Sequence, residues 1–448
     1  DAEVPRPLTF FGVPMSLSFS VSPTVRLNRE PYGVVVNNVD LSTSYVVDPL
    51  SGYSLVLLAK YGYDYSLEKL SRLIGWDKAE LLMSKLHERI PEAFIRIGKY
   101  SRDYSFYFDR LDEEKFLYNV NLEDLMKANL GYRISSVPER VYVRDEGGIS
   151  PARVVDFIQS MSNERRQVPN HLIILGLKRS YFAEHLISRT PDWIFKELMI
   201  RWPPEDLEYE EMDFDKITLV VDHYSFFNKT DSVMDFLSRI SRRRTQVNYI
   251  TAFEMGDSYK NLYRLLGASD ILSIRPIEME KLSWAKVPTA HAINDAYEKI
   301  SSILISLREE SGYLVYKDRQ LVDLSYLEDV ALKRMARTVP RSEHRCQAYR
   351  TQIAIASSGN VLGCPWIPDV PELSLGNILK EIFREIWSRA GKLAFPEVFE
   401  QSSCSGCEYL EICSKYFGFC YAWNSFLFGN ILQQDRFCYK ENQPTVPE

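Results

Sequence analysis

Between residues 92 and 309, short apolar runs alternate with stretches of helical periodicity. The apolar runs are rich in β-branched residues and predict seven strands: AFIRIG (93–98), RVYVRD (140–145), HLIILGL (171–177), ELMIRW (197–202), ITLVVDH (217–223), QVNYITAFE (246–254) and DILSIRPIE (270–278). Helical patterns lie between them, in PARVVDFIQSM (151–161), SVMDFLSRISRR (232–243) and AHAINDAYEKISSILISLREE (290–310). This alternation predicts βαβ units on a mostly parallel sheet. Six or seven units in about 220 residues favour a full or partial barrel over an open doubly wound sheet.

The N-terminal segment has a different pattern. Residues 1–30 predict an irregular arm, and the runs at 32–38 (YGVVVNN) and 44–50 (SYVVDPL) predict two strands. Three helices follow, of which the first ends at Gly62 and the second takes Ser66 as its N-cap. The third begins near Asp77 and is expected to turn one apolar face inward, with Leu81, Leu82 and Leu86.

Two strands followed by three helices are typical of a small winged-helix unit, and also of a generic αβ module. Residues 31–91 resemble the RiPP recognition element, a winged-helix domain that binds leader peptides by adding a strand to its hairpin. The resemblance implies that this segment binds a peptide.

The chain has seven cysteines, and all lie in one C-terminal window: Cys346, Cys364, Cys404, Cys407, Cys413, Cys420 and Cys438. Thiols scattered through a core would not cluster in this way. An odd number of cysteines after 345 residues without one also fits a disulfide framework poorly. The clustering therefore favours metal or iron–sulfur ligation, with disulfides or buried thiols as the alternative. Zinc is the rival metal, because thiolate sites accept it readily.

The spacing of these cysteines resembles the SPASM domain, the C-terminal extension of radical-SAM enzymes that modify peptides and proteins. Cys346 is followed by Gly359-x4-Cys364, by LSLGNILKEIFREIW (373–387), and then by C-x2-C-x5-C-x6-C over 404–420. The sequence departs from the family in one place, because six residues precede Cys420 where the family has three. Carried over by position, one [4Fe–4S] cluster would be held by four thiolates: Cys404, Cys407, Cys413 and Cys438. A second would be held by Cys346, Cys364 and Cys420, with its fourth iron open or bound by His344 or Glu343.

The resemblance also implies a radical-SAM barrel upstream, where C-x3-C-x2-C after the first strand holds the cluster that cleaves S-adenosylmethionine (SAM). No cysteine precedes Cys346. At the family's spacing, after AFIRIG, the chain has Tyr100, Tyr104 and Tyr107. Phenolic oxygens are hard ligands with a pKa near 10, and they replace low-pKa thiolates poorly.

The family's SAM-binding G-G-E-P after the second strand reads Gly147-Gly148-Ile149-Ser150 in this chain. Ile149 stands where a glutamate would accept a hydrogen bond from the SAM ammonium. The later S-x-D-G signature is replaced by the region around Asp222-His223-Tyr224, where a buried structural histidine is the alternative to a catalytic one. SAM cleavage and SAM binding are therefore not expected.

Composition sets further bounds. The net charge of −7 argues against a general nucleic-acid binder, although Arg242, Arg243 and Arg244 stand together. No apolar run approaches the roughly 20 residues that span a bilayer. No G-x-G-x-x-G or G-x-x-x-x-G-K-[ST] motif follows a predicted strand, which excludes nucleotide-phosphate loops of the usual kinds. Oxygen-sensitive clusters favour a cytoplasmic location.

The sequence thus predicts an α/β chain with four parts: an arm at 1–30, a winged-helix domain at 31–91, a degenerate radical-SAM partial barrel at 92–335 and a SPASM domain at 336–448. Its expected function is that of an iron–sulfur protein that binds a peptide or protein in a hetero-complex and transfers electrons or acts as a scaffold. The alternative is an enzyme that uses the open iron of the Cys346/Cys364/Cys420 cluster.

Overall fold

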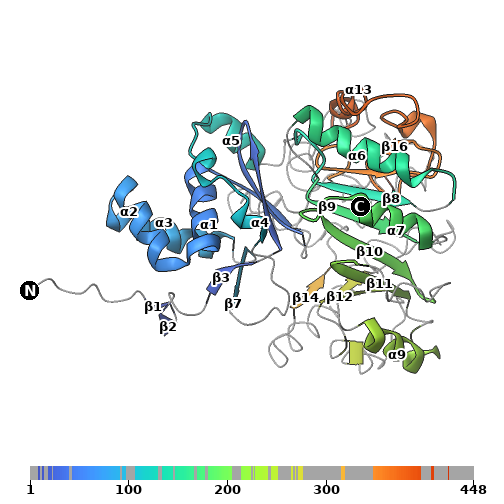
Figure 1. The fold of residues 1–448 in the computed structure, drawn as a ribbon, viewed down its shortest axis with the longest axis horizontal. Helices are drawn as coiled ribbons and strands as arrows, with labels where there is room; N and C mark the ends of the chain where they lie inside the picture. The colour runs from blue at the N-terminus through green and yellow to red at the C-terminus, as the bar shows by residue number, and fades with distance from the viewer. Residues whose placement is uncertain are drawn as a thin grey trace, which may run out of the picture. The chain divides into compact units, whose positions relative to one another are not determined.

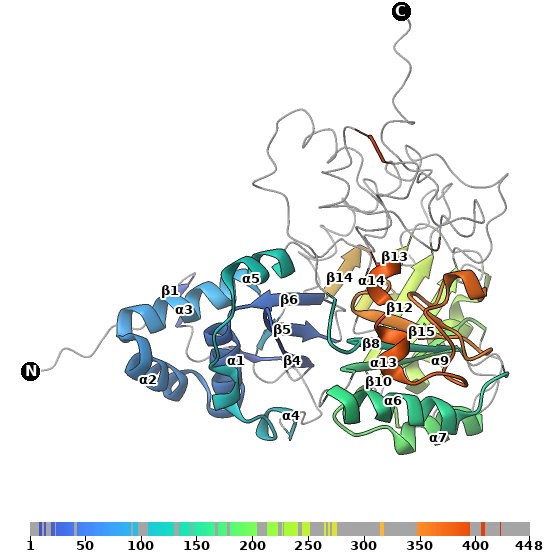
Figure 2. The ribbon, with the colours of Figure 1, turned by 90° about the horizontal axis from the view of Figure 1, so that it is seen from above.

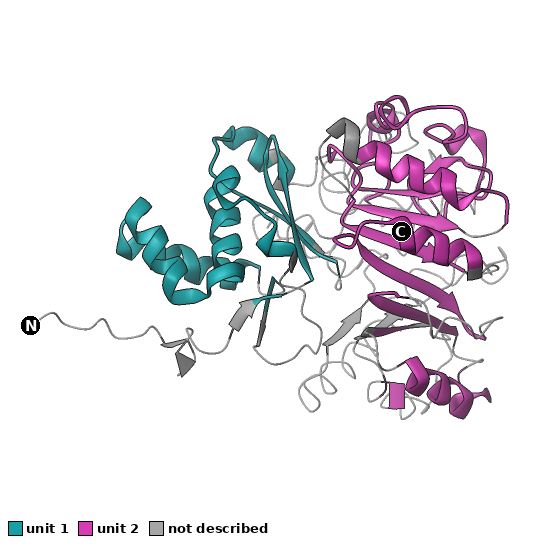
Figure 3. Ribbon diagram, viewed as in Figure 1, with its two compact units in different colours: residues 1–133 teal, residues 134–448 magenta. Residues whose placement is uncertain are grey.

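The structure is a computed structural model that describes most of the chain in separate ranges. They are 19–22, 24–39, 43–90, 93–96, 106–129, 134–144, 147–165, 169–176, 180–203, 213–222, 228–240, 244–250, 271–275, 314–317, 347–394 and 405–407, with short pieces at 9–10, 13–14, 226, 264–265, 268 and 422. The chain divides into two compact units, Asp1–Arg133 and Ile134–Glu448 (Figure 3).

Unit 1 is built on a three-stranded antiparallel sheet in the order β4-β5-β6. Its strands are β4 (Val25–Glu30), β5 (Gly33–Asn38) and β6 (Thr43–Val47). The two predicted strands are confirmed, whereas Val25–Glu30, expected in an irregular arm, is a strand. Its sequence VRLNRE has only two apolar residues, and its buried face includes polar side chains such as Arg26 and Asn28, so no hydrophobic strand pattern marks it.

Three helices follow the sheet: α1 (Pro49–Tyr61), α2 (Tyr63–Ile74) and α3 (Trp76–Arg89). The α1 helix packs against β5, and Gly52 has no room for a side chain because its Cβ would lie 2.6 Å from a methyl group of Val34 (Figure 2). The side chain of Asp48 caps α1 by accepting a hydrogen bond from the backbone N–H of Ser51 at 3.0 Å.

Two details of these helices differ from the prediction. A helix with Ser66 as its N-cap would begin at Leu67, but α2 begins four residues earlier, at Tyr63. The Ser66 hydroxyl lies inside the helix and donates to the carbonyl of Gly62. In α3 the buried face is Ala79, Met83 and Leu86, which follows the spacing i, i+4, i+7. Leu81 is 53% exposed, because the small side chain of Ala79 occupies the inward position.

The rest of unit 1 is a set of short elements. They are β1 (Thr9–Phe10), β2 (Val13–Pro14), β3 (Phe19–Val21), β7 (Phe94–Arg96), α4 (Phe106–Asp109), the 3-10 helix η3 (Glu113–Phe116) and α5 (Leu122–Asn129). The α5 helix packs against β6, and its Ala128 joins Val35 and Val46 in a small apolar cluster. AFIRIG was expected to be the first strand of the parallel sheet. It is a strand, but β7 pairs antiparallel with β3.

Unit 2 contains a nine-stranded sheet in the order β14-β13-β12-β11-β10-β9-β8-β15-β16. All neighbours are parallel except β15 and β16. The strands are β8 (Arg140–Arg144), β9 (His171–Leu175), β10 (Phe195–Arg201), β11 (Lys216–Asp222), β12 (Arg244–Ile250), β13 (Ile271–Arg275), β14 (Leu314–Lys317), β15 (Gln352–Ile355) and β16 (Val361–Leu362).

Six predicted strands are confirmed as β8 to β13, and they lie side by side in chain order. This order lacks the reversal that defines a doubly wound sheet. The expected closure of these strands into part of a barrel stays a prediction.

The helices of unit 2 are α6 (Pro151–Arg165), α7 (Ser180–Arg189), α9 (Thr230–Ile240), α13 (Phe383–Trp387) and α14 (Ala390–Leu393), with the 3-10 helix η7 (Pro371–Leu373) (Figure 1). The predicted helices at 151–161 and 232–243 correspond to α6 and α9, and the one at 290–310 lies outside the described residues. No helix in the described ranges is long and apolar enough to cross a membrane.

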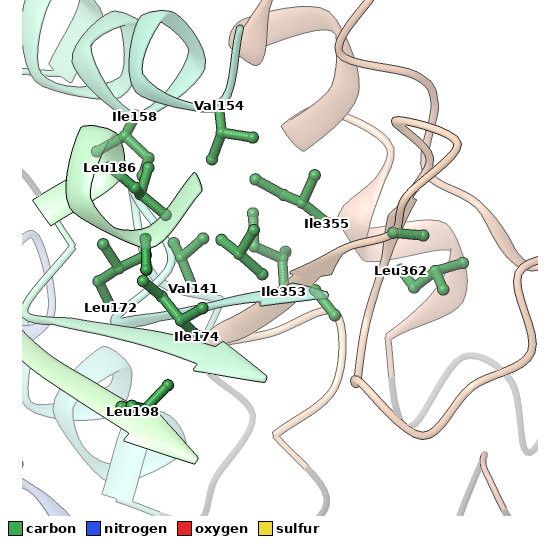
Figure 4. Close-up of a cluster of buried hydrophobic side chains, with 14 of the residues drawn as sticks. Val141, Val154, Ile158, Leu172, Ile174, Leu186, Leu198, Ile353, Ile355 and Leu362 are labelled. Carbon is green, nitrogen blue, oxygen red and sulfur yellow. The ribbon is translucent and has the colours of Figure 1, made fainter. Parts of the chain in front are cut away.

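One hydrophobic core joins the sheet, its helices and the C-terminal hairpin of unit 2. Val154 and Ile158 of α6 and Leu186 of α7 lie over the strand residues of β8 and β9, and Ile353 and Ile355 of β15 continue the same layer (Figure 4). The α13 helix packs on α6, with the rings of Phe157 and Phe383 5.9 Å apart. The segment that carries Cys364 is therefore anchored on the same core as the parallel sheet.

Candidate iron-sulfur site

Cys364 follows a tight hairpin that extends the nine-stranded sheet. The parallel pairing of β8 with β15 sets Gln352 beside Arg140, and β15 then turns back into β16 with Ile355 beside Val361. The turn is made by Gly359, whose φ of 86° is in the region that favours glycine. Its N–H donates to the carbonyl of Ala356 at 2.9 Å. The glycine of the Gly-x4-Cys motif is thus the residue that reverses the chain before the cysteine.

The Leu-Gly-Asn-Ile motif at 375–378 lies beside the hairpin as a further extended segment. The N–H of Val361 donates to the carbonyl of Gly376 at 2.8 Å, and the N–H of Leu375 donates back to the carbonyl of Val361 at 2.8 Å. The Asn377 side-chain amide donates to the side-chain oxygen of Asn360 at 2.9 Å and to the carbonyl of Ser358 at 3.1 Å. The motif therefore fixes the hairpin turn from its outer side.

Immediately before Cys364, Gly363 lies against the face of Tyr349. A Cβ at Gly363 would lie 2.6 Å from the Tyr349 ring, which is closer than side chains can pack. The Tyr349 hydroxyl donates to the carbonyl of Leu373 at 2.7 Å, and Tyr349 is fully buried, so the ring has no room to move away. Cys364 itself is half-buried and packs against the core of unit 2.

Cys407 is the second described cysteine, and it ends a turn made by Ser405 and Gly406. Gly406 has a φ of 90°, which is the conformation that a type II turn needs at its third position. Such a turn brings the two ends of a C-x2-C motif together, as two ligands of one cluster require. Five candidate ligands lie outside the described residues: Cys346, Cys404, Cys413, Cys420 and Cys438. His344 and Glu343 lie outside them as well.

The loop after β8 carries the predicted remnant of a SAM-binding motif. Gly147 has a φ of 101°, and a Cβ on Gly148 would lie 2.4 Å from the carbonyl oxygen of Ser357 in the hairpin turn. Ile149 is only 3% exposed and belongs to the hydrophobic core. The side chain at the position of the family's glutamate therefore points into an apolar environment.

Of the three tyrosines at the spacing of the family's cluster cysteines, Tyr107 is described, and Tyr100 and Tyr104 lie outside the described residues. Tyr107 is buried in unit 1, where its hydroxyl accepts the N–H of Leu27 at 2.8 Å and donates to the carbonyl of Leu27 at 3.2 Å. The Arg26 guanidinium lies 4.5 Å from the ring centre. Burial raises the pKa of Tyr107, so the neutral phenol is the form that these contacts hold.

Sequence reasoning missed a buried charged group at the beginnings of three neighbouring strands. His171 opens β9, Glu197 is the third residue of β10, and Lys216 opens β11. Oε2 of Glu197 lies 2.8 Å from Nε2 of His171 and 3.6 Å from Nζ of Lys216. Thr218 donates a hydrogen bond to Oε1 of the same carboxylate, and all four side chains are buried.

The charges in this group are set by burial and by mutual contact. Burial alone would raise the pKa of Glu197, but the Lys216 ammonium, with the contacts from His171 and Thr218, lowers that pKa from 4.5 to about 2. Burial lowers the pKa of His171. In parallel α/β sheets, ligands bind at the carboxyl ends of the strands, and this group lies at the amino-terminal ends. We therefore assign this group to stability. At the carboxyl end, Asp222 closes β11, and His223 and Tyr224 lie outside the described residues.

Residues 346–408 match the SPASM family, an iron-sulfur cluster-binding domain. The chain therefore contains a SPASM domain, as its cysteine spacing predicts. No curated protein matches the chain.

Among solved structures, SuiB of Streptococcus suis is similar over 94% of this chain and 99% of its own, at 13% sequence identity and a TM-score of 0.56. SuiB bound to S-adenosylmethionine is similar over 90% and 96% of the two chains, at 14% identity and a TM-score of 0.54. SuiB bound to the precursor peptide SuiA is similar over 93% and 98%, at 15% identity and a TM-score of 0.56. At these identities the likeness shows the fold: a mixed α/β chain with a parallel sheet like that of SuiB.

Proposed function

We propose that this chain is an iron–sulfur protein that binds a peptide or partner protein through unit 1 and does not cleave SAM. In this proposal the SPASM domain holds two [4Fe–4S] clusters, which transfer electrons or stabilise a larger hetero-complex. The observation that carries the proposal is that positions aligned with SAM chemistry have packing roles, whereas the SPASM cysteine pattern persists.

The fit of the iron–sulfur clusters rests on the donor set. Seven cysteines are present at SPASM spacing, and soft thiolates are the ligands that iron–sulfur clusters take. The described part of the site supports this fit, because Gly359 reverses the chain into the strand that leads to Cys364, and Gly406 lies in the turn that ends at Cys407. The remaining ligands follow from the spacing alone.

The residues do not fit SAM and its cluster. The chain has no cysteine before Cys346, so three thiolates cannot come from the region after AFIRIG. Tyr107 uses its hydroxyl on the backbone of Leu27, and Ile149 offers no hydrogen-bond acceptor from its side chain. SuiB has been observed with bound SAM. In this chain the side chains of Tyr107 and Ile149 offer neither the thiolate nor the carboxylate that the radical-SAM motifs supply at these positions.

The support for peptide binding comes from the two edges of the β4-β5-β6 sheet. On β4, the Tyr107 hydroxyl takes both backbone groups of Leu27 in the middle of the strand. This edge is therefore closed to another strand. On β6, no strand among the described residues pairs on the side away from β5. An edge strand of this kind is a template for an added peptide strand.

The pairing pattern identifies the backbone groups that would receive the peptide. The backbone N–H and C=O of Leu27 point away from β5, toward Tyr107. Leu27 and Val36 are therefore a non-hydrogen-bonded pair. Alternation then turns Val36 toward Tyr45 of β6, and it turns the backbone N–H and C=O of Val46 away from β5. A peptide added at this edge would form hydrogen bonds with Val46.

The first test is anoxic purification with iron analysis and EPR spectroscopy. We expect about eight irons per chain, as two [4Fe–4S] clusters require. Cys364→Ser and Cys407→Ser should each remove one cluster and leave the other. Incubation with SAM and a reductant should give no 5′-deoxyadenosine. Formation of 5′-deoxyadenosine, or an iron-free chain, would refute the proposal.

The second test addresses peptide binding in the full-length chain. Val46→Pro removes the outward N–H of β6, whereas Val46→Ala keeps it and serves as the matched control. We expect a peptide or protein that co-purifies with the wild type to remain with Val46→Ala and to be lost with Val46→Pro. Equal retention by both variants would place the binding elsewhere.

A further inference from the structure

The remnant of the SAM-binding loop lies against the hairpin that carries Cys364. After the parallel pair β8–β15, one strand continues into Gly147 and Gly148 and the other into Ala356 and Ser357. A Cβ on Gly148 would lie 2.4 Å from the Ser357 carbonyl oxygen and 3.0 Å from its carbonyl carbon. Both are backbone atoms, so no side-chain rotation can relieve the overlap. Gly148 is therefore the position at which the two segments approach most closely.

The loop itself cannot move away to make room. Ile149 is buried in the core of unit 2, next to Gly148 in the chain, and Val143 of the preceding strand is buried as well. Displacing the loop would pull these side chains out of a close-packed core. The hairpin turn, which bears the overlapped Ser357 carbonyl, must therefore take up at least part of the displacement.

Movement of the turn is transmitted to Cys364. Ser357 follows β15 directly, the N–H of Ala356 donates to the carbonyl of Asn360 at 2.9 Å, and Val361 and Leu362 pair with β15. Cys364 comes two residues after Leu362, and Gly363 between them packs directly on the Tyr349 ring. A side chain at Gly148 would therefore press on the hairpin that ends at the cysteine and disturb its packing on that ring.

From these contacts we propose that Gly148 is a positioning residue for the cluster that Cys364 binds. This inference rests on the proposed function, and it gives the glycine pair a purpose that does not involve SAM. Metal ligands must hold their distances to within about 0.2 Å. Relieving the Gly148→Ala overlap requires a backbone shift of about 1 Å, from 2.4 Å to an ordinary contact of 3.4 Å or more.

The test compares Gly148→Ala with Gly391→Ala in the full-length chain. Gly391 is a matched control in the same unit, because its Cβ would lie 3.6 Å from the nearest atom, an ordinary contact. After anoxic reconstitution we expect Gly148→Ala to lose the iron and the EPR signal of the Cys364 cluster and to keep those of the other cluster. Gly391→Ala should match the wild type. Adding Ser357→Gly, which frees the backbone that must move, should restore part of the lost signal.

A second measurement, on the iron-free chain, keeps the inference testable without any cluster. We expect the rate of Cys364 alkylation, followed by mass spectrometry, to differ by about threefold or more between Gly148→Ala and Gly391→Ala, because the displaced hairpin changes the exposure of the thiol. Cys407 should react equally in both. Equal Cys364 alkylation, or equal cluster content in a wild type that does carry clusters, would overturn the inference. A wild type without clusters would instead refute the proposed function.

Discussion

Replacing Glu197 with glutamine should destabilise unit 2 strongly, because it leaves a buried cation without its partner. Lys216 is 1% exposed, and its Nζ lies 3.6 Å from the Glu197 carboxylate. Glutamine has nearly the same shape and can still accept the hydrogen bond from Thr218. The substitution therefore changes the charge and little else.

The expected cost follows from the separation of the two charges. At 3.6 Å and an effective dielectric constant of about 20, the lost attraction is about 5 kcal/mol. Breaking buried pairs by removing one partner typically costs about 3–5 kcal/mol. We expect a loss in that range, which is a large part of the stability of a domain.

The assay is urea denaturation followed by tryptophan fluorescence. Six of the seven tryptophans lie in unit 2, so the signal reports mainly on that unit. A loss of about 3 kcal/mol lowers the midpoint by roughly 1 M when the urea dependence is about 3 kcal/mol per molar. Asp235→Asn is the matched control, because it removes a carboxylate that lies 3.4 Å from Nε of Arg239 in a pair whose two side chains are both exposed. Exposed pairs contribute about 1 kcal/mol or less.

The double variant Glu197→Gln with Lys216→Met separates charge from packing. Removing both charges should restore most of the stability, since buried ion pairs are often replaceable by apolar groups of similar size. Our reasoning would be refuted if Glu197→Gln shifted the midpoint no more than Asp235→Asn. It would also be refuted if the double variant were as unstable as the single one.

Three further substitutions or conditions test other parts of the structure. Between pH 5 and pH 3 the wild type should lose about 2 kcal/mol of stability, because the pKa of Glu197 is lower in the folded chain than in the unfolded one, and Glu197→Gln should lose less over the same urea titrations. Ile149→Glu should lower the melting temperature of unit 2 and leave SAM binding undetectable by calorimetry, because it buries a carboxylate without restoring the cluster cysteines. Tyr107→Phe should speed hydrogen exchange at the Leu27 amide, which loses its partner, whereas Tyr181→Phe at an exposed site should leave that amide unchanged.

Six strands of the parallel sheet could be predicted because each is a short run rich in apolar residues, and β9, β10 and β11 are largely buried. Their partners could not. Gln352 lies beside Arg140, and the Trp387 indole donates to the carbonyl of Ser135 at 2.8 Å, although these residues are far apart in the chain. The same holds for AFIRIG. Its pattern predicts a strand, but it does not determine whether that strand pairs with β3, as it does in the structure, or with β8.

The part of the candidate site that could be predicted is the part whose residues recur at fixed intervals along the sequence. Cysteines and turn glycines recur at fixed intervals, so the SPASM pattern could be recognised from the sequence. His171, Glu197 and Lys216 have no such interval, because three separate βα units bring them together. Their only sign in the sequence is a charged residue at the beginning of an apolar strand, and charged residues are too common for that to be decisive.

Three residues stand at positions where the family binds SAM or its cluster, and each has a packing role in this structure. A glycine that allows close backbone approach is useful wherever two segments must meet, so Gly148 serves the hairpin turn at Ser357. A residue that no longer needs a polar ligand can join the core, as Ile149 does, and a tyrosine can close a strand edge, as Tyr107 does at Leu27. Each of these side chains stabilises its own unit. Introducing SAM ligands at these positions would therefore require new cysteines and also the loss of packing on which unit 1 and the Cys364 hairpin depend.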